Sequence, residues 1–216
     1  HMLKPDIAAP GLDVLSSTPP SAAGGQAFSV FAGTSMATPH VAGAAALLVQ
    51  RHPGWEPWQV KSALMGTAGP AWGNTARTQE ASVWMEGAGL ANVAAADDPR
   101  IFTSPQSLSF GDIDVSLQEQ HVGRLLAVTD AGGGIGSWTI ELRPQAQTSR
   151  VSISVPGRFD VLPGTDASIP VTLIVPQDAG LGENSGFIVL RSGSVQRRVP
   201  YAFIVERPEL RTAPVT

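Results

Sequence analysis

A single serine stands between a glycine and a run of helix-forming residues in the segment FAGTSMATPHVAG, residues 31–43. If Gly33 allows a sharp turn and a helix starts after it, the backbone N–H of Ser35 lies at the positive end of the helix dipole. That N–H could stabilise an oxyanion at a carbonyl that the Ser35 hydroxyl attacks. The pattern indicates acyl transfer by a serine nucleophile. The alternative is that Ser35 only caps the helix, since serine is a common N-cap residue.

The nearest histidine is badly placed to activate this serine. His40 follows five residues later, which on a helix is about 140° around the axis and about 7.5 Å along it. We therefore expect His40 to point away from Ser35 and to be a buried histidine with a hydrogen-bonding role. His52 stands at the expected C-terminal end of the helix, where the dipole favours it. His121 lies far along the chain without a candidate partner.

Acidic residues do not suggest a metal centre. The pairs Asp97-Asp98 and Asp112-Asp114 are too sparse for calcium, which requires a dense set of oxygen ligands. We expect them to be charges at turns and strand edges. No metal and no cofactor is therefore predicted for this chain.

Composition excludes several other classes of function. The 216 residues are 43% hydrophobic and 15% charged, which is enough apolar material for two modest cores. A net charge of -4 without a Lys/Arg cluster argues against nucleic acid or an anionic membrane as partner. Without cysteine there is no disulfide or thiolate site. The longest apolar run, residues 41–49, is too short to span a membrane.

Two helices are expected in the first half. Residues 35–52 form a helix that Pro53-Gly54 ends, and because it is apolar on nearly every side we expect it to be buried. A second helix starts near Glu56-Pro57, with the proline at the first helical position, and runs until Gly69-Pro70.

The pattern changes near Asp97-Asp98-Pro99 from alanine-rich helices to alternating β-branched and polar residues. Seven or eight short strands follow, with buried positions at period two, and they suit an all-β, immunoglobulin-like sandwich. The expected organisation is residues 1–2 as an expression scar, 3–97 and 98–207 as two domains, and 208–216 as a tail. The strand segments are SLSFGDIDV, GRLLAVTD, SWTIELR, RVSISV, RFDVL, ASIPVTLIV, GFIVLRS and VQRRVPYAFIVE.

The segment GTSMATPHVAG, residues 33–43, resembles the serine motif of the subtilisin-like serine proteases, the subtilases of peptidase family S8, without departure. The resemblance extends to KPDIAAPG (4–11), HPGWEPWQVKSALMGTA (52–68) and EGAGLANVAAA (86–96). SLSFGDIDV is similar to the first strand of the sandwich appended in cucumisin-like and related bacterial subtilases. The resemblance implies the C-terminal portion of an α/β subtilisin-like domain, followed by an immunoglobulin-like or fibronectin III-like sandwich.

By this resemblance Ser35 is the catalytic nucleophile and its N–H an oxyanion donor. The motif around it is completed by Gly33, Thr34, Met36, Pro39 and His40. The family's order is Asp, His, Ser, so both partners should precede Ser35. Only 34 residues do, with no histidine except His1, and the DTG or DSG and HGT motifs are absent. Asp6 and Asp13 are not in the context of the triad aspartate.

The oxyanion-hole asparagine of the family also lacks a match, because none of Asn74, Asn92 and Asn184 has the corresponding context. The sequence is thus interpreted as a fragment of a secreted endopeptidase that acts on peptides and is inactive by itself, with any calcium sites in the parent protein. The missing N-terminal segment or a second copy should cover the apolar helix. Two alternatives stay open: a binding module whose sandwich recognises a protein or glycan, and a subtilase-type transpeptidase or macrocyclase.

Overall fold

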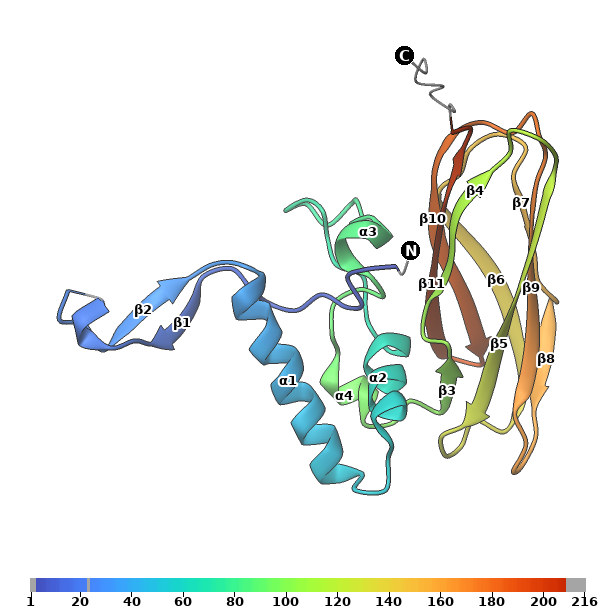
Figure 1. The fold of residues 1–216 in the computed structure, drawn as a ribbon. Coiled ribbons are helices and arrows are strands. Elements are labelled where there is room, and N and C mark those ends of the chain that lie inside the picture. Colours follow the sequence, from blue (N-terminus) through green and yellow to red (C-terminus); the bar gives the residue numbers. More distant parts are fainter. Residues whose placement is uncertain (1–2, 23, 209–216) are drawn as a thin grey trace, which may run out of the picture.

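The computed structural model describes residues 3–22 and 24–208, so the predicted scar and all but the first residue of the predicted tail lie outside the described residues. Helices dominate an N-terminal helical unit (residues 3–96), and strands form a C-terminal two-sheet unit (residues 101–206) (Figure 1). The helical unit contains β1 (Val14–Ser17), the 3-10 helix η1 (Pro20–Ala22), β2 (Phe28–Phe31), α1 (Thr34–Arg51), α2 (Pro57–Gly66), α3 (Val83–Glu86) and α4 (Val93–Ala96). The two-sheet unit contains β3 (Ile101–Ser104), β4 (Leu108–Asp114), β5 (Gln120–Asp130), β6 (Gly136–Ala146), β7 (Ser152–Ser154), β8 (Arg158–Val161), β9 (Ala167–Val175), β10 (Gly182–Ser192) and β11 (Val195–Glu206).

The two predicted helices are present, and the end of the second differs from the prediction. α1 ends one residue before His52, and α2 begins at Pro57, where the N–H of Glu56 donates to the side chain of Gln59 over 2.7 Å. α2 stops at Gly66, not at Gly69. Gly69 and Leu90 instead exchange two backbone hydrogen bonds of 2.9 and 2.7 Å, which pull the chain out of the helix.

The burial predicted for α1 is wrong in this structure. Only Ala44 and Leu48 of the helix are buried, whereas Leu47 is 54% and Val49 is 53% exposed. The buried side of α1 packs on α2 and α4, in a cluster that includes Val60, and no other described segment covers the opposite side (Figure 1). One side of this apolar helix is therefore exposed.

A β-hairpin that the sequence did not predict precedes α1. Its strands β1 and β2 pair antiparallel, with Leu15 opposite Val30 and Ser17 opposite Phe28. The hairpin projects away from the rest of the molecule (Figure 1), and Leu15, Phe28 and Val30 are exposed. Its first strand, VLSS, does not alternate between apolar and polar residues, which is the pattern that identifies a half-buried strand.

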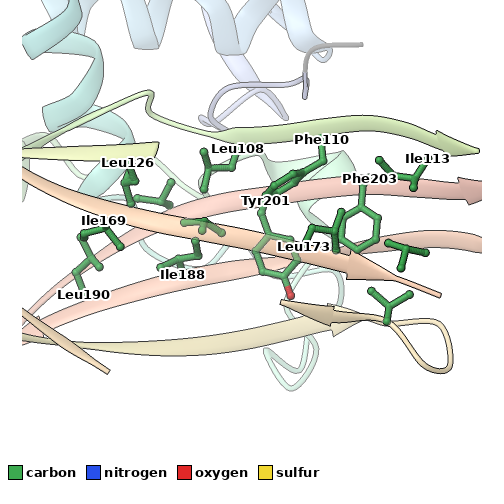
Figure 2. Close-up of a cluster of buried hydrophobic side chains, with 14 of the residues drawn as sticks. Leu108, Phe110, Ile113, Leu126, Ile169, Leu173, Ile188, Leu190, Tyr201 and Phe203 are labelled. Carbon is green, nitrogen blue, oxygen red and sulfur yellow. The ribbon is translucent and has the colours of Figure 1, made fainter. Parts of the chain in front are cut away.

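The two-sheet unit contains every predicted strand segment and one more, β3. One sheet has the order β4-β11-β10-β6-β8, in which β4 and β11 run parallel, and the other has the order β3-β5-β9-β7. Both sheets contribute to one buried core (Figure 2), whose members include Leu108, Phe110, Leu126, Ile169, Leu173, Ile188, Tyr201 and Phe203. On β9 the period-two prediction is confirmed, because Val171, Leu173 and Val175 are buried.

β10 and β11 are buried on both faces, although one buried face per strand was predicted. Ile188 and Leu190 face the shared core. Phe187, Val189 and Ala202 form a second cluster with Leu3 and Val83 of the helical unit. The helical unit therefore packs on the outer face of the five-stranded sheet.

Polar contacts cross the same junction. Gln145 of β6 accepts from the N–H of Val83 over 2.8 Å and donates to the carbonyl of Ala81 over 3.0 Å. The guanidinium of Arg197 donates to the carbonyls of Asp98 and Pro99 in the connection between the units. These side chains satisfy backbone groups that no helix or strand would pair.

Candidate functional site

Ser35 lies at the second position of α1, and its side chain is exposed. The N-cap residue is Gly33, so the interpretation of Ser35 as a helix cap is wrong. Within residues 3–22 and 24–208 the Ser35 hydroxyl has no hydrogen-bond partner. The hydroxyl is accordingly open to an approaching group.

Gly33 gives the turn before α1 its shape. Its φ of 144° and ψ of 170° lie in a region that favours glycine. The N–H of Gly33 donates to the carbonyl of Gly11 over 2.7 Å, and a Cβ placed on Gly11 would lie 2.7 Å from the carbonyl oxygen of Gly33. The two segments approach closely only because Gly11 has no side chain.

The first turn of α1 leaves a donor unpaired beside the serine. The N–H groups of Met36 and Ala37 both donate to the carbonyl of Gly33, at 3.0 and 3.4 Å. The N–H of Ser35 has no partner among the described residues. As a group at the positive end of an 18-residue helix, it can donate to a developing oxyanion.

Pro39 and the threonines shape the same turn. Pro39 lies inside α1 and has no N–H, so the carbonyl of Ser35 lacks its usual helical donor. The hydroxyl of Thr38 donates to the carbonyl of Thr34 over 2.9 Å. At the start of the helix, the Thr34 carbonyl is therefore hydrogen-bonded, whereas the Ser35 side chain is exposed.

His40 is exposed, so its predicted burial is wrong. The side of α1 on which it lies has no cover among the described residues. Its Nδ1 donates to the carbonyl of Met36 over 2.8 Å, and this confirms the predicted hydrogen-bonding role. The bond directs the ring back along the helix. It gives His40 no contact with the Ser35 hydroxyl.

The other candidate histidines and carboxylates pair away from Ser35. His52 stacks on Trp55 at 3.8 Å between ring centroids, and its Nε2 lies 2.8 Å from Oδ1 of Asp97. Hydrogen bonds from Arg51 and His52 hold the pKa of Asp97 below its usual range. His121 contacts Glu119 on the surface. These pairs lie at the C-terminal end of α1 and at the start of β5.

Further acidic side chains and asparagines have structural partners. Asp6 pairs with Lys4 and Lys61, and Asp98 pairs with Arg100. Asn74 bonds to Thr78, Asn92 caps α4 at the N–H of Ala95, and the buried Asn184 bonds to Thr148. Over the described ranges, no three side chains of His, Asp, Glu or Cys gather as a metal site would require.

A groove of about 650 Å³ lies between α1 and residues 5–9. Its walls are mostly apolar, from the strand-like segment 5–9 on one side and from α1 on the other, with Thr34, Ala37, Thr38 and Val41 among the residues of the helix. The groove begins in the same turn as Ser35. None of the helices of the described residues has the length and hydropathy that crossing a membrane requires.

Comparison with known proteins points to one family for this part of the chain. Residues 1–96 match the model of the subtilase family. The subtilisin-like protease SBT4.3 of Arabidopsis thaliana is 40% identical over 109 residues, which are 46% of this chain and 14% of that protein. The minor extracellular protease Vpr of Bacillus subtilis (strain 168) is 29% identical over 220 residues, which are 96% of this chain and 26% of that protein.

The chain therefore spans about a seventh to a quarter of the length of these curated relatives. The solved structure of the Vibrio cholerae VesB protease aligns with 10% identity and a TM-score of 0.31, over 65% of this chain and 41% of that one. A likeness this weak adds nothing to the family match.

Proposed function

Residues 1–96 belong to the subtilase family, and we propose that Ser35 is the nucleophile of a serine endopeptidase acting on peptides bound in extended form. The observation that carries the proposal is the exposed Ser35 hydroxyl next to its own unpaired N–H, at the start of an 18-residue helix. A cap or scaffold residue would have no need for both groups to be free. In this proposal the motif residues support the turn that carries Ser35; they are Gly33, Thr34, Met36, Pro39 and His40.

In the proposed reaction the Ser35 oxygen attacks the carbonyl carbon of the scissile peptide bond and its proton passes to a histidine base. The carbonyl oxygen becomes an oxyanion, to which the N–H of Ser35 donates. When the C–N bond breaks, the amine leaves with the proton and the acyl group stays on Ser35. Water then releases the acid and regenerates the hydroxyl.

The base and its carboxylate partner are proposed to come from residues outside this chain, because no described histidine contacts Ser35. The chain by itself should then be nearly inert, since loss of triad members costs about 10⁶-fold in turnover in subtilisin. The name of the Bacillus relative, an extracellular protease, favours secretion for this protein as well.

The uncovered side of α1 is proposed to be closed by the segment that supplies these residues, or by a second copy of the chain. The exposed Leu47 and Val49 support this proposal. The two-sheet unit is proposed to be an immunoglobulin-like or fibronectin III-like sandwich that stabilises and positions the helical unit. The packing of Phe187 and Val189 on Val83 supports this role.

The proposal is tested on the full-length product of the gene, with a peptide substrate in H₂¹⁸O. Hydrolysis places one ¹⁸O in each new carboxyl end, whereas a transpeptidase would join the acyl group to an amine without ¹⁸O. We expect ¹⁸O-labelled products from the wild type and none from Ser35→Ala. Unchanged cleavage by Ser35→Ala would refute the role of Ser35.

A further inference from the structure

Three charged side chains meet at the junction between the helical and the two-sheet units. Arg198 of β11 lies 2.6 Å from a carboxylate oxygen of Glu80 and 3.4 Å from one of Glu86. Glu86, at the end of α3, is 1% exposed, and Arg198 is 6% exposed. The group thus joins residues more than 100 positions apart in the chain. Glu86 and Arg198 are nearly inaccessible to water, whereas the side chain of Glu80 is 31% exposed.

The charges of this cluster do not balance when both carboxylates are ionised. One guanidinium then faces two carboxylates, and the net charge is -1. Arg143 of β6 also interacts electrostatically with Glu80, but its side chain is hydrogen-bonded to Glu141. Burying an unbalanced charge is costly. One proton on the carboxylates removes the imbalance.

Other groups surround the charged atoms of this cluster. The guanidinium of Arg198 lies over the ring of Phe187, 3.5 Å from its centroid, and the Arg198 Nε is buried without a partner. Glu86 accepts one hydrogen bond from the N–H of Ala71 over 2.6 Å. Burial raises the pKa of Glu86 to about 7; Glu80 adds to the rise, and the Ala71 N–H and Arg198 oppose it.

Backbone hydrogen bonds connect Glu86 to the turn of Ser35. Directly after Glu86, the N–H of Ala88 donates to the carbonyl of Asp6 and the N–H of Ala8 donates to Gly89, at 2.9 and 2.8 Å. The same segment continues to Gly11, whose carbonyl accepts from Gly33. Gly87 packs closely against the backbone of Pro5, because a Cβ on Gly87 would lie 2.3 Å from the carbonyl oxygen of Pro5.

We propose that Glu86 and Arg198 form a proton-dependent lock between the two units, and that this lock positions residues 6–11 and through them the turn that carries Ser35. Glu86 is a positioning residue in this account. The importance of the turn for catalysis rests on the proposed function. The lock itself is a property of folding and can be measured without any hydrolysis.

The direction of the pH effect follows from the proton balance. The folded state holds a proton on the cluster up to about pH 7, whereas an unfolded glutamate loses it near pH 4.5. The stabilisation from the proton is complete below the unfolded pKa and is lost as the pH rises towards 7. The folded chain should therefore melt at lower temperature at pH 8 than at pH 5.

The test is a series of thermal unfolding curves of the full chain between pH 5 and pH 8. Glu86→Gln keeps an acceptor for the Ala71 N–H and cannot ionise. We expect the melting temperature of the wild type to fall by at least about 4 °C over this range in excess of any change in Glu86→Gln. Glu141→Gln, in an exposed ion pair, is the matched control and should keep the wild-type slope.

The other ionisable groups of the chain are unchanged in the variant, so the difference between the two slopes belongs to Glu86. A slope in Glu86→Gln equal to that of the wild type would overturn the lock. If Glu86→Gln does not fold, ¹³C NMR of the wild-type carboxyl groups decides: one glutamate should titrate near pH 7, and titration of every glutamate below pH 5.5 would overturn the proposal.

Amide hydrogen exchange, corrected for its intrinsic pH dependence, tests the positioning of the turn. In the wild type, protection of residues 6–9, of 87–91 and of Gly33 should decrease together as the pH rises from 6 to 8. In Glu86→Gln it should not change. If Gly33 keeps its protection while residues 87–91 lose theirs, the lock does not position the serine turn.

Discussion

The N–H of Gly33 donates to the carbonyl of Gly11 over 2.7 Å, and this bond ties the turn before Ser35 to the segment that enters the β1–β2 hairpin. Both partners are glycines for physical reasons. Gly33 has a φ of 144°, and Gly11 leaves room for the carbonyl oxygen of Gly33. The position of the serine thus depends on a contact that lies outside its own helix.

Gly11→Ala should displace the serine turn. The added methyl group would meet the carbonyl oxygen of Gly33 at 2.7 Å and the Cβ of Ala37 at 3.2 Å. We expect a loss of about 1–3 kcal/mol in the free energy of unfolding, as for other insertions into a packed site. Chemical denaturation of the full chain measures it.

Gly43→Ala is the matched control for that substitution. Gly43 lies in α1, and a Cβ there meets no atom within 4 Å. Because alanine favours a helix over glycine, the control should stabilise the chain by about 0.5–1 kcal/mol. If both variants lose stability equally, the close approach at Gly11 is not what fixes the turn.

The two neighbouring leucines of α1 should differ sharply. Leu48 is 1% exposed and Leu47 is 54% exposed. Leu48→Ala should lower the free energy of unfolding by about 2–5 kcal/mol, because it leaves a cavity between α1 and α2. Leu47→Ala should change it by less than about 0.5 kcal/mol when the chain is monomeric. Equal losses at a monomeric concentration would contradict the placement of α1.

The open side of α1 should act as an association surface when nothing else covers it. Leu47→Asp places a charge on that side without touching the buried one. If a second copy covers the helix, sedimentation velocity of the wild type should show a concentration-dependent dimer that Leu47→Asp abolishes. A wild-type monomer at all concentrations would leave the separate N-terminal segment as the proposed cover.

Arg197 should contribute to the junction through its bonds to backbone carbonyls. Arg197→Met keeps most of the aliphatic side chain and removes the donors to Asp98 and Pro99. Two hydrogen bonds from a charged donor would be lost, although the Pro99 carbonyl keeps the N–H of Ile101. We expect a cost of about 1–3 kcal/mol in the free energy of unfolding. Arg191→Met, in an exposed pair with Glu141, is the control and should cost less than about 1 kcal/mol. A loss at Arg197 no greater than at Arg191 would contradict this assignment.

Local patterns predicted much of the fold. The start of α1 after Gly33, the start of α2 at Pro57 and the strand segments of the two-sheet unit follow from turn residues, capping and periodicity. The end of α2 could not be predicted, because the pairing of Gly69 with Leu90 removes residues 67–69 from the helix. β1 (VLSS) and β3 (IFTS) do not alternate between apolar and polar residues, and the four residues of β2 pair only with β1, so none of the three was predicted.

The site could be predicted as a motif but not as a geometry. The residues of α1 predict a helix, but the described chain covers it on one side only, so the burial of the helix and of His40 was mispredicted. The cluster of Glu80, Glu86 and Arg198 gave no signal in the sequence. Its members come together only when the helical unit packs on β11, and their spacing along the chain follows no motif.

The most direct test of the account is intact-mass labelling with a fluorophosphonate probe, which reacts only with an activated serine. It is carried out on this chain alone and on the full-length gene product, each as wild type and as Ser35→Ala. We expect one covalent adduct, mapped to Ser35, in the full-length wild type and nearly none in the other three samples. A full-length wild type that stays unlabelled, or an adduct that persists in Ser35→Ala, would contradict the assignment of Ser35 as a nucleophile.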